Sequence, residues 1–310
     1  MGDAIRAWLP WPSPDGYLGG LPDGYQADYF AGGADRPDSI DTVELYVPEY
    51  MAGPGAYEVI TEMPALKVVQ TQTAGYEHVL PFLRNGVTLC NARGVHDAST
   101  AELAVTLILS TYRQIPEAVR DADRQVWPGY EGFQDSLADR TVLIVGYGSI
   151  GEALELRLAG FECKVLRVAR REREGVSPVS ALPDLLPHAD VVVLLTPATD
   201  ETKGMVDKAF LGRMKDGALL VNVSRGSVID TDALLAELGS GRLRAGLDVT
   251  DPEPLPAGHP LWFAPNVLIT PHRGGASTAF APRIARLVKS QLERYAAGQP
   301  LVNIVAGPQR

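Results

Sequence analysis

The segment from Thr141 to Gly151 constrains the fold more than any other part of the chain. It reads Thr-Val-Leu-Ile-Val-Gly-Tyr-Gly-Ser-Ile-Gly, an aliphatic strand that runs into a glycine loop, and the helical stretch Glu152–Leu158 follows. Gly146 permits the tight turn, Gly148 lets backbone N–H groups approach a ligand, and Gly151 lets the helix pack on the sheet. A diphosphate would lie at the N-terminus of that helix, where the first N–H groups have no intrahelical partner. The pattern predicts a dinucleotide-binding unit.

The next strand ends without the acid that would accept hydrogen bonds from a ribose 2′-hydroxyl. Ala169 occupies that position, about 20 residues past the glycines, and Arg170 and Arg171 follow at once. Two guanidinium groups can instead hold a 2′-phosphate through charge-assisted hydrogen bonds, each of which contributes about 1.5–3 kcal/mol. We therefore expect NADP(H) to be preferred and NAD(H) to be possible. The alternative is that both arginines belong to a solvated charged run, Arg170–Glu174.

Strand-like segments alternate with helical ones, which is typical of parallel, doubly wound sheets. Six aliphatic runs in the second half fit strands covered on both faces: Val142–Val145, Val165–Val168, Val191–Leu195, Leu219–Val223, Ala245–Val249 and Val267–Ile269. A looser series without a glycine fingerprint occupies the first hundred residues: Val43–Val47, Lys67–Gln72 and Val87–Cys90. We expect a dinucleotide-binding domain of the Rossmann type, residues 96–279, inserted into a smaller α/β substrate domain, residues 1–95 plus 280–310.

Two predicted helices mark the joint between these domains. The spacing of Ser99 and Glu102 fits a capping box, in which the two side chains satisfy first-turn N–H groups, and it predicts a helix over residues 101–112. The other helix covers residues 281–297. The chain is expected to cross between domains near residues 92–98 and to return near residues 277–282.

Composition limits the classes of partner. The net charge of −10 argues against nucleic acid and against an anionic membrane. The two cysteines, Cys90 and Cys163, lie in apolar strand-like contexts, so a disulfide framework is not expected. The first fourteen residues lack the apolar stretch of a secretory signal, and no apolar segment is long enough to span a bilayer. We expect a soluble cytoplasmic protein.

Three polar side chains follow predicted strands at the edge where ligands bind in such sheets. Arg225 follows Leu219–Val223, Glu253 lies in the turn after Ala245–Val249, and His272 comes directly after the last strand. Each alone would be read as a surface charge. Together they suit reduction of a 2-keto acid. Arginine can hold the planar carboxylate, histidine can donate a proton near neutral pH, and a neighbouring carboxylate favours the imidazolium.

The whole chain resembles the D-isomer-specific 2-hydroxyacid dehydrogenase family, within the formate/glycerate dehydrogenase-like superfamily. The segments that carry the resemblance occur in the expected order: Val69–Val79, Asn91–Glu102, the glycine loop, Leu195–Pro197, Asn222–Gly226, Asp248–Pro256 and Thr270–Ser277. The missing acid at Ala169 is similar to the NADP-using glyoxylate/hydroxypyruvate reductase branch. The resemblance implies a flavodoxin-like fold for the smaller domain, a small 2-keto or 2-hydroxy acid as substrate, and a homodimer.

The resemblance also implies roles for individual residues. Arg225 would bind the substrate, His272 would be the acid/base, Glu253 would be its partner, and backbone N–H groups of Ala74 and Gly75 would hold the substrate carboxylate. The cofactor contacts implied by the glycine loop and the resemblance are Thr100, Gly146, Gly148, Ser149, Ile150, Gly151, Arg170, Arg171, Thr196, Pro197, Val223, Asp248 and Gly274.

Two other classes of protein fit the sequence less well than this enzyme. A nucleotide-sensing regulatory protein with weak catalysis could keep the fold, but it would not need an acid/base pair. A short-chain dehydrogenase would need a Tyr followed four residues later by Lys, and none of the eleven tyrosines has that neighbour. The sequence therefore favours an NADP(H)-dependent D-2-hydroxyacid dehydrogenase that works as a 2-keto acid reductase.

Overall fold

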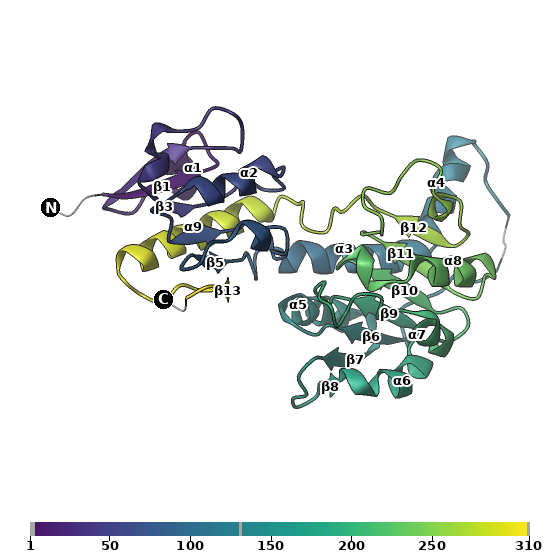
Figure 1. Cartoon of the computed structure of the whole chain (residues 1–310). Helices are drawn as coiled ribbons and strands as arrows, with labels where there is room; N and C mark the ends of the chain where they lie inside the picture. Colours follow the sequence, from purple (N-terminus) through teal and green to yellow (C-terminus); the bar gives the residue numbers. More distant parts are fainter. Residues whose placement is uncertain (1–3, 130–131, 309–310) are drawn as a thin grey trace. The chain divides into compact units, whose positions relative to one another are not determined.

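The protein is made of two α/β units, each with its own sheet and core (Figure 1). The computed structural model describes residues 4–129 and 132–308. The first unit combines the two ends of the chain, residues 1–96 and 278–310, and the second unit is the continuous stretch 97–277 between them. The second unit is therefore inserted into the first. No helix in the described part of the chain is long and apolar enough to cross a membrane.

The inserted unit holds a seven-stranded, fully parallel sheet in the order β12-β11-β10-β9-β6-β7-β8. Its strands are β6 (Thr141–Val145), β7 (Lys164–Ala169), β8 (Ser177–Pro178), β9 (Val191–Leu194), β10 (Leu219–Asn222), β11 (Arg244–Leu247) and β12 (Val267–Ile269). The chain winds outward from β6 in one direction and from β9 in the other. The strand order therefore reverses between β6 and β9, which is where such sheets bind ligands.

Helices cover both faces of this sheet, and its central strands β6, β9 and β10 are accordingly buried and aliphatic, except for the half-buried Thr141 and the buried Asn222. The helices are α3 (Asp97–Tyr112), α4 (Ile115–Asp123), α5 (Ser149–Leu158), α6 (Leu182–Leu185), α7 (Lys208–Arg213) and α8 (Thr231–Gly239). Residues of α3 and α5 share one core cluster with β6, β9 and β10. The Rossmann-type fold predicted for this part of the chain is confirmed.

The predicted start of the first long helix is wrong. Helix α3 begins at Asp97, two residues before the proposed capping serine, so Ser99 lies inside the first turn and is buried. A serine within the helix cannot act as its N-cap, because the cap residue precedes the helical turn. The acidic Asp97 stands in the first turn instead, where a carboxylate interacts favourably with the helix dipole.

The other unit holds a six-stranded sheet in the order β13-β5-β4-β3-β1-β2, parallel except for β13, which pairs antiparallel with β5. Its strands are β1 (Ile5–Leu9), β2 (Tyr25–Tyr29), β3 (Val43–Tyr46), β4 (Val68–Gln70), β5 (Thr88–Cys90) and β13 (Ile304–Ala306). Its helices are α1 (Pro14–Leu18), α2 (Gly55–Glu58) and α9 (Phe280–Ala296). Strands β1, β2 and β13 were not predicted from the sequence.

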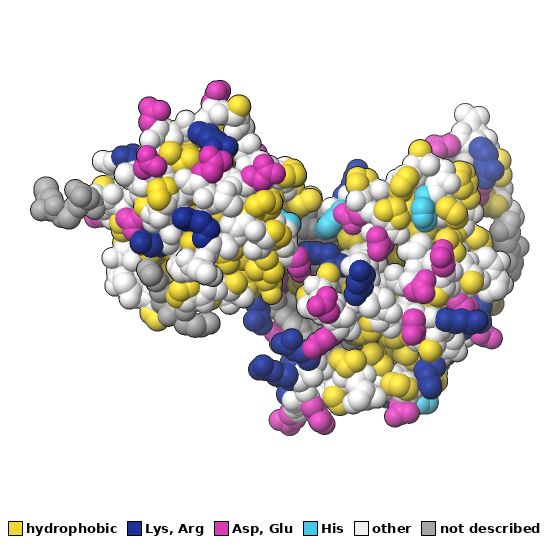
Figure 2. Space-filling view, in the orientation of Figure 1, with side chains coloured by type: hydrophobic (Ala, Val, Ile, Leu, Met, Phe, Trp, Pro, Cys, Tyr) yellow, Lys and Arg dark blue, Asp and Glu magenta, His cyan; other side chains and the backbone are white. Residues whose placement is uncertain are grey.

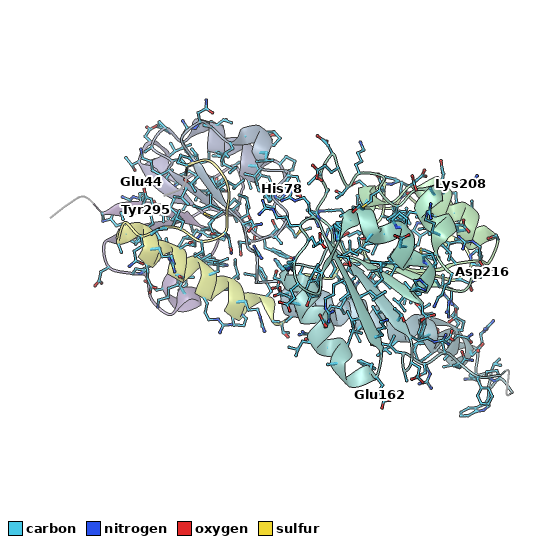
Figure 3. The ribbon with its side chains drawn as sticks, turned by 90° about the horizontal axis from the view of Figure 1, so that it is seen from below. Glu44, His78, Glu162, Lys208, Asp216 and Tyr295 are labelled. Atoms are coloured by element: carbon cyan, nitrogen blue, oxygen red, sulfur yellow. The ribbon has the colours of Figure 1, made fainter. Side chains whose placement is uncertain are left out.

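Helix α9 returns to the first unit and is held there by polar contacts as well as by its apolar face. The Tyr295 hydroxyl donates to Glu44 Oε2 on β3 at 2.8 Å, and the two labelled side chains lie beside each other in Figure 3. The buried Gln291 amide donates to Gln70 Oε1 on β4 and to the Val302 carbonyl, while its oxygen accepts from the Val302 N–H at 3.0 Å. This amide thus joins α9, β4 and the segment that leads into β13.

Replacing Gln291 with leucine should destabilise the protein by about 1–3 kcal/mol, because it leaves buried donors and acceptors without partners. Urea unfolding followed by circular dichroism measures the loss. Glu293→Leu on the exposed side of the same helix is the matched control and should change stability by less than about 0.5 kcal/mol. Equal effects of the two substitutions would refute the proposed importance of the amide contacts.

Candidate active site

The glycine loop lies at the point where the strand order of the inserted sheet reverses. Gly146 follows β6 with φ of +99°, and a Cβ there would stand 2.6 Å from the carbonyl carbon of Leu195, which follows β9. A side chain at this position is therefore excluded both by conformation and by space. Ser149 and Ile150 open α5, so the backbone N–H groups of its first turn face the end of the sheet.

Two features around this loop fit a dinucleotide. A Cβ on Gly148 would have no atom within 4 Å, so the space next to this backbone is open to a ligand. The hydroxyl of Thr196, just beyond β9, is buried and has no hydrogen-bond partner within the described part of the chain. An unpaired buried hydroxyl is unfavourable unless something else supplies a partner. Pro197 follows Thr196 in the same loop. The residues expected to contact the cofactor after β6 and after β9 thus leave open space and an unpaired hydroxyl for a bound polar group.

Tyr147, which lies between Gly146 and Gly148 in the glycine loop, is fixed by its own contacts. Its ring lies where a Cβ on Gly151 would approach within 3.0 Å, so glycine at 151 gives room to the ring as well as to the sheet. Its hydroxyl donates to Glu155 Oε2 at 2.5 Å, and Arg167 on β7 forms an ion pair with the same carboxylate. These bonds hold the pKa of Glu155 below its usual value, chiefly through Arg167. The loop is therefore preorganised by residues of α5 and β7.

The arginine run after β7 divides into two kinds of residue. Arg170 and Arg171 are exposed, and neither makes a hydrogen bond or ion pair within residues 4–129 and 132–308. Arg173 instead donates to the Tyr147 carbonyl at 2.8 Å, and its guanidinium lies 5.5 Å from the centre of the Tyr147 ring. Basic side chains gather beside the turn that joins β7 and β8 in Figure 2. Arg173 could not be recognised from the sequence, because spacing alone does not distinguish it from its neighbours.

Arg225, Glu253 and His272 come from three adjacent strands that end in register. Asn222 on β10 pairs with Leu247 on β11, and Leu247 pairs with Ile269 on β12. The three side chains follow these strand ends along one edge of the sheet. Glu253 Oε1 lies 2.5 Å from His272 Nδ1, so the carboxylate accepts from this nitrogen and the opposite ring nitrogen, Nε2, points away from the pair.

The electrostatics of the three residues are coupled. Hydrogen bonding to Glu253 raises the pKa of His272 above its ordinary value of 6.5, although partial burial and the nearby positive charge of Arg225 oppose this shift. The same hydrogen bond lowers the pKa of Glu253, and Arg225 acts in the same direction. The three charges are thus close enough to act on one another. Glu253 carries its charge near neutral pH and keeps a larger share of His272 protonated there.

The backbone around Arg225 is held by a buried amide. Asn222, at the end of β10, donates to the Arg225 carbonyl at 2.9 Å and accepts from both the N–H and the hydroxyl of Ser224. A Cβ on Gly226 would stand 1.9 Å from the Thr250 carbonyl oxygen, so the loops after β10 and β11 touch at this glycine. These contacts fix the point from which the Arg225 side chain projects.

Three of the expected cofactor contacts form one cluster near the end of β11. The Thr100 hydroxyl donates to the Gly274 carbonyl at 3.3 Å, and the Gly274 N–H donates to Asp248 Oδ2 at 2.7 Å. Val223, another of these residues, is buried just beyond β10. The structure therefore brings together Thr100, Asp248 and Gly274, which come from three separate motifs of the sequence.

Ala74 and Gly75 belong to the other unit. The loop that contains them is fixed by side chains: Asn91 donates to the Ala74 carbonyl at 2.7 Å, and the Thr73 hydroxyl donates to the Gly75 carbonyl at 2.6 Å. His96 lies near the same loop, with Nε2 at 2.9 Å from the Gln72 carbonyl, and its ring stacks against Phe280. These contacts give buried His96 a structural place in this unit.

Comparison with known proteins identifies relatives of this chain. Residues 105–274, more than half of the chain, match the sequence profile of the NAD-binding domain of D-isomer-specific 2-hydroxyacid dehydrogenases. The glyoxylate reductase/hydroxypyruvate reductase of Homo sapiens is 34% identical over 250 residues, which cover 76% of this chain and 76% of the human protein.

Two solved structures have the same architecture. A D-isomer-specific 2-hydroxyacid dehydrogenase from Xanthobacter autotrophicus Py2, in complex with NADPH and MES, is 27% identical and superposes with a TM-score of 0.81 over 98% of both chains. The NAD-dependent formate dehydrogenase of Staphylococcus aureus, in complex with NAD, is 26% identical with a TM-score of 0.76 over 98% of this chain and 99% of that one. The fold, the sequence profile and the human relative together show that the chain belongs to the D-isomer-specific 2-hydroxyacid dehydrogenase family.

Proposed function

We propose that the protein is an NADP(H)-dependent D-2-hydroxyacid dehydrogenase that works as a reductase of small 2-keto acids. The observation that carries the proposal is the hydrogen-bonded pair of His272 and Glu253 at the carboxyl edge of the inserted sheet, next to Arg225. A proton donor held by a carboxylate beside a guanidinium is what reduction of a keto acid requires. A nucleotide-sensing protein would gain nothing from this pair, so the alternative without catalysis is not favoured.

The residues of this chain would divide the chemistry between binding and proton transfer. Arg225 holds the substrate carboxylate and polarises the carbonyl oxygen, and backbone N–H groups of Ala74 and Gly75 contribute to holding the carboxylate. The bound nicotinamide cofactor supplies the hydride that goes to the carbonyl carbon. His272 donates the proton from Nε2 to the carbonyl oxygen, while Glu253 keeps Nδ1 protonated and stabilises the imidazolium before transfer. In the oxidation direction the neutral imidazole accepts the same proton.

The proposed activity is tested by mixing the purified protein with NADPH and a panel of keto acids: glyoxylate, hydroxypyruvate, pyruvate and branched or aromatic 2-keto acids. Loss of absorbance at the nicotinamide band reports turnover. We expect reduction of at least the small members, since the human relative is named for glyoxylate and hydroxypyruvate. No turnover with any member would refute the proposal.

The charged residues after β7 are the basis for the proposed preference for NADP(H). Ala169 leaves no carboxylate to repel a 2′-phosphate, and the exposed Arg170 and Arg171 can move toward one without breaking an existing ion pair in the described residues. Arg173 is already engaged with the glycine loop and adds positive charge beside them. Of the two solved structures reported above, one is a complex with NADPH and the other a complex with NAD, so these residues, and not the family, carry the proposal.

We also propose a cytoplasmic homodimer. Helix α4 and the segment after it expose large apolar side chains: Ile115, Val119, Val126, Trp127 (96% exposed) and Phe133 (97% exposed). Such a concentration of exposed apolar surface is typical of an interaction site. Tyr130, a further aromatic residue of this segment, lies outside the described residues.

Glu253→Gln should move the alkaline limb of the pH profile for keto-acid reduction to lower pH. The reduction needs protonated His272, and loss of the carboxylate removes the interaction that raises the pKa of that imidazole. His272→Ala should lower kcat by about 10²–10⁴-fold while NADPH binding stays nearly intact. Initial rates between pH 5.5 and about 10 measure the first effect.

The matched control for that profile is Glu237→Gln, which breaks an ion pair with Arg242 elsewhere in the inserted unit. It should leave the limb in place. A limb that does not move in Glu253→Gln, or turnover that survives His272→Ala, would contradict the proton-donor assignment.

Replacing both Arg170 and Arg171 with alanine should raise the KM for NADPH by at least about ten- to a hundredfold and leave the KM for NADH nearly unchanged, because loss of even one charge-assisted contact costs about 1.5–3 kcal/mol. Arg213→Ala, an exposed arginine on α7, is the control and should change neither value. A wild-type kcat/KM that is equal for both cofactors, or higher with NADH, would refute the cofactor preference.

Trp127→Ser combined with Phe133→Ser should shift the molar mass measured by light scattering toward that of one chain, since the exposed apolar surface would no longer support association. Phe263→Ser, an exposed aromatic elsewhere in the inserted unit, should leave a mass of two chains. A wild-type mass of one chain at micromolar concentration would show that the proposed dimer does not form.

A further inference from the structure

We propose that Arg173 is a positioning residue for cofactor selection: it holds the arginine loop, residues 170–172, against the glycine loop. This role rests on the proposed preference for NADP(H) and differs from direct contact with a phosphate. The glycine loop follows β6 and the arginine loop follows β7, and the two strands are paired neighbours in the inserted sheet. The arginine loop lies between β7 and the edge strand β8 (Figure 1).

The arginine loop is short, and backbone contacts anchor it on both sides. On its N-terminal side, Ala169 ends β7 and pairs with Pro178 on β8. On its C-terminal side, Arg173 and the buried Val176 form a tight turn. The Val176 N–H donates to the Arg173 carbonyl at 2.8 Å, and the Arg173 N–H donates to the Val176 carbonyl at 3.2 Å. Residues 170–172 therefore lie between two anchored points of the backbone.

The side chain of Arg173 joins this loop to the glycine loop. Its Nη2 donates to the Tyr147 carbonyl at 2.8 Å, and its guanidinium carbon lies 5.5 Å from the centre of the Tyr147 ring. A guanidinium at this distance over a ring is attracted by the negative face of the aromatic system. Oε1 of Glu152, in the first turn of α5, lies 4.0 Å from the same nitrogen. The guanidinium thus contacts a carbonyl, a ring and a carboxylate of the segment that begins with the glycine loop.

Tyr147 is a fixed partner, because its other contacts do not involve Arg173. Its hydroxyl donates to Glu155 Oε2 at 2.5 Å. The backbone N–H groups of Gly146 and Tyr147 each donate to the Val168 carbonyl at 2.9 Å. The glycine loop therefore keeps its place without Arg173, and loss of the Arg173 side chain releases the arginine loop alone.

The two loops suit different parts of a dinucleotide. The N–H groups at the start of α5 suit the diphosphate, which NADP(H) and NAD(H) share, whereas Arg170 and Arg171 suit the 2′-phosphate, which only NADP(H) carries. A loop that is already held in place loses less conformational freedom when it binds a ligand. Arg173 thus strengthens the binding of NADPH by Arg170 and Arg171 and leaves the binding of NADH nearly unchanged.

Dissociation constants of NADPH and NADH, measured by the fluorescence of the reduced nicotinamide, test this role without turnover. Arg173→Ala should weaken NADPH binding by about three- to tenfold and NADH binding by less than about twofold. In a chain that already carries Arg170→Ala and Arg171→Ala, the same substitution should weaken NADPH binding by less than about twofold, because residues that act through one another are not additive.

Two further variants separate the contacts of Arg173 from its charge. Tyr147→Leu removes the ring under the guanidinium without changing the charge, and it should weaken NADPH binding by about two- to fivefold more than NADH binding. Arg213→Ala, which removes an exposed positive charge at the end of α7, is the matched control and should change neither dissociation constant.

Hydrogen exchange in the cofactor-free protein reports directly on the arginine loop. The amides of Arg173 and Val176 are hydrogen-bonded in the turn, and they exchange when the turn opens. Deuterium uptake by peptides that cover residues 170–178 should rise in Arg173→Ala, because the side chain no longer holds the turn to the glycine loop. The same peptides should show unchanged uptake in Arg213→Ala.

An Arg173→Ala effect of equal size with and without Arg170 and Arg171 would overturn the positioning role, because Arg173 would then act on the phosphate itself. Unchanged deuterium uptake in Arg173→Ala would overturn it too, as would unchanged NADPH binding where the wild-type protein prefers NADPH. A wild-type protein that binds both cofactors equally, together with higher uptake in Arg173→Ala, would refute the NADP(H) preference and support the hold of Arg173 on the arginine loop.

Discussion

The hydrogen bond between His272 Nδ1 and Glu253 Oε1, 2.5 Å long, is the interaction on which the rest of the site depends. It forms only if the loops after two adjacent strands end at the same level of the sheet. The parallel register of β10, β11 and β12 provides this alignment, and the loop contacts of Asn222 and Asp248 convert it into fixed positions for the functional side chains. The register of the sheet thus determines where the functional side chains lie.

Local charge has to overcome the charge of the whole protein. The chain carries a net charge of −10, which repels anionic keto acids and nucleotide phosphates alike. Positive charge is therefore needed at two separate places, Arg225 at the carboxyl edge of the sheet and the arginines after β7. The first place would serve the substrate and the second the cofactor, so the two binding events can be altered independently by substitution.

Much of the inserted unit could be predicted from the sequence, because buried parallel strands are aliphatic throughout and the glycine loop has a distinctive spacing. The smaller unit was harder: β13 has three residues and pairs antiparallel, and β2 is a partly exposed edge strand. Strand ends pointed to Arg225, Glu253 and His272. The loop contacts of Asp248 and the hydrogen bond from Arg173 to the Tyr147 carbonyl depend on tertiary packing. They could not be predicted from the local spacing of residues.

The central claim, that a basic, an acidic and an imidazole side chain act together on a keto acid beside the nicotinamide ring, is tested most directly by a crystal structure with NADPH and oxamate, an unreactive amide analogue of a small keto acid. The account predicts that Arg225 contacts the oxamate carboxylate, that His272 Nε2 lies within hydrogen-bond distance of its carbonyl oxygen, and that Nδ1 keeps its bond to Glu253. Oxamate bound elsewhere, or His272 turned away from it, would contradict the account.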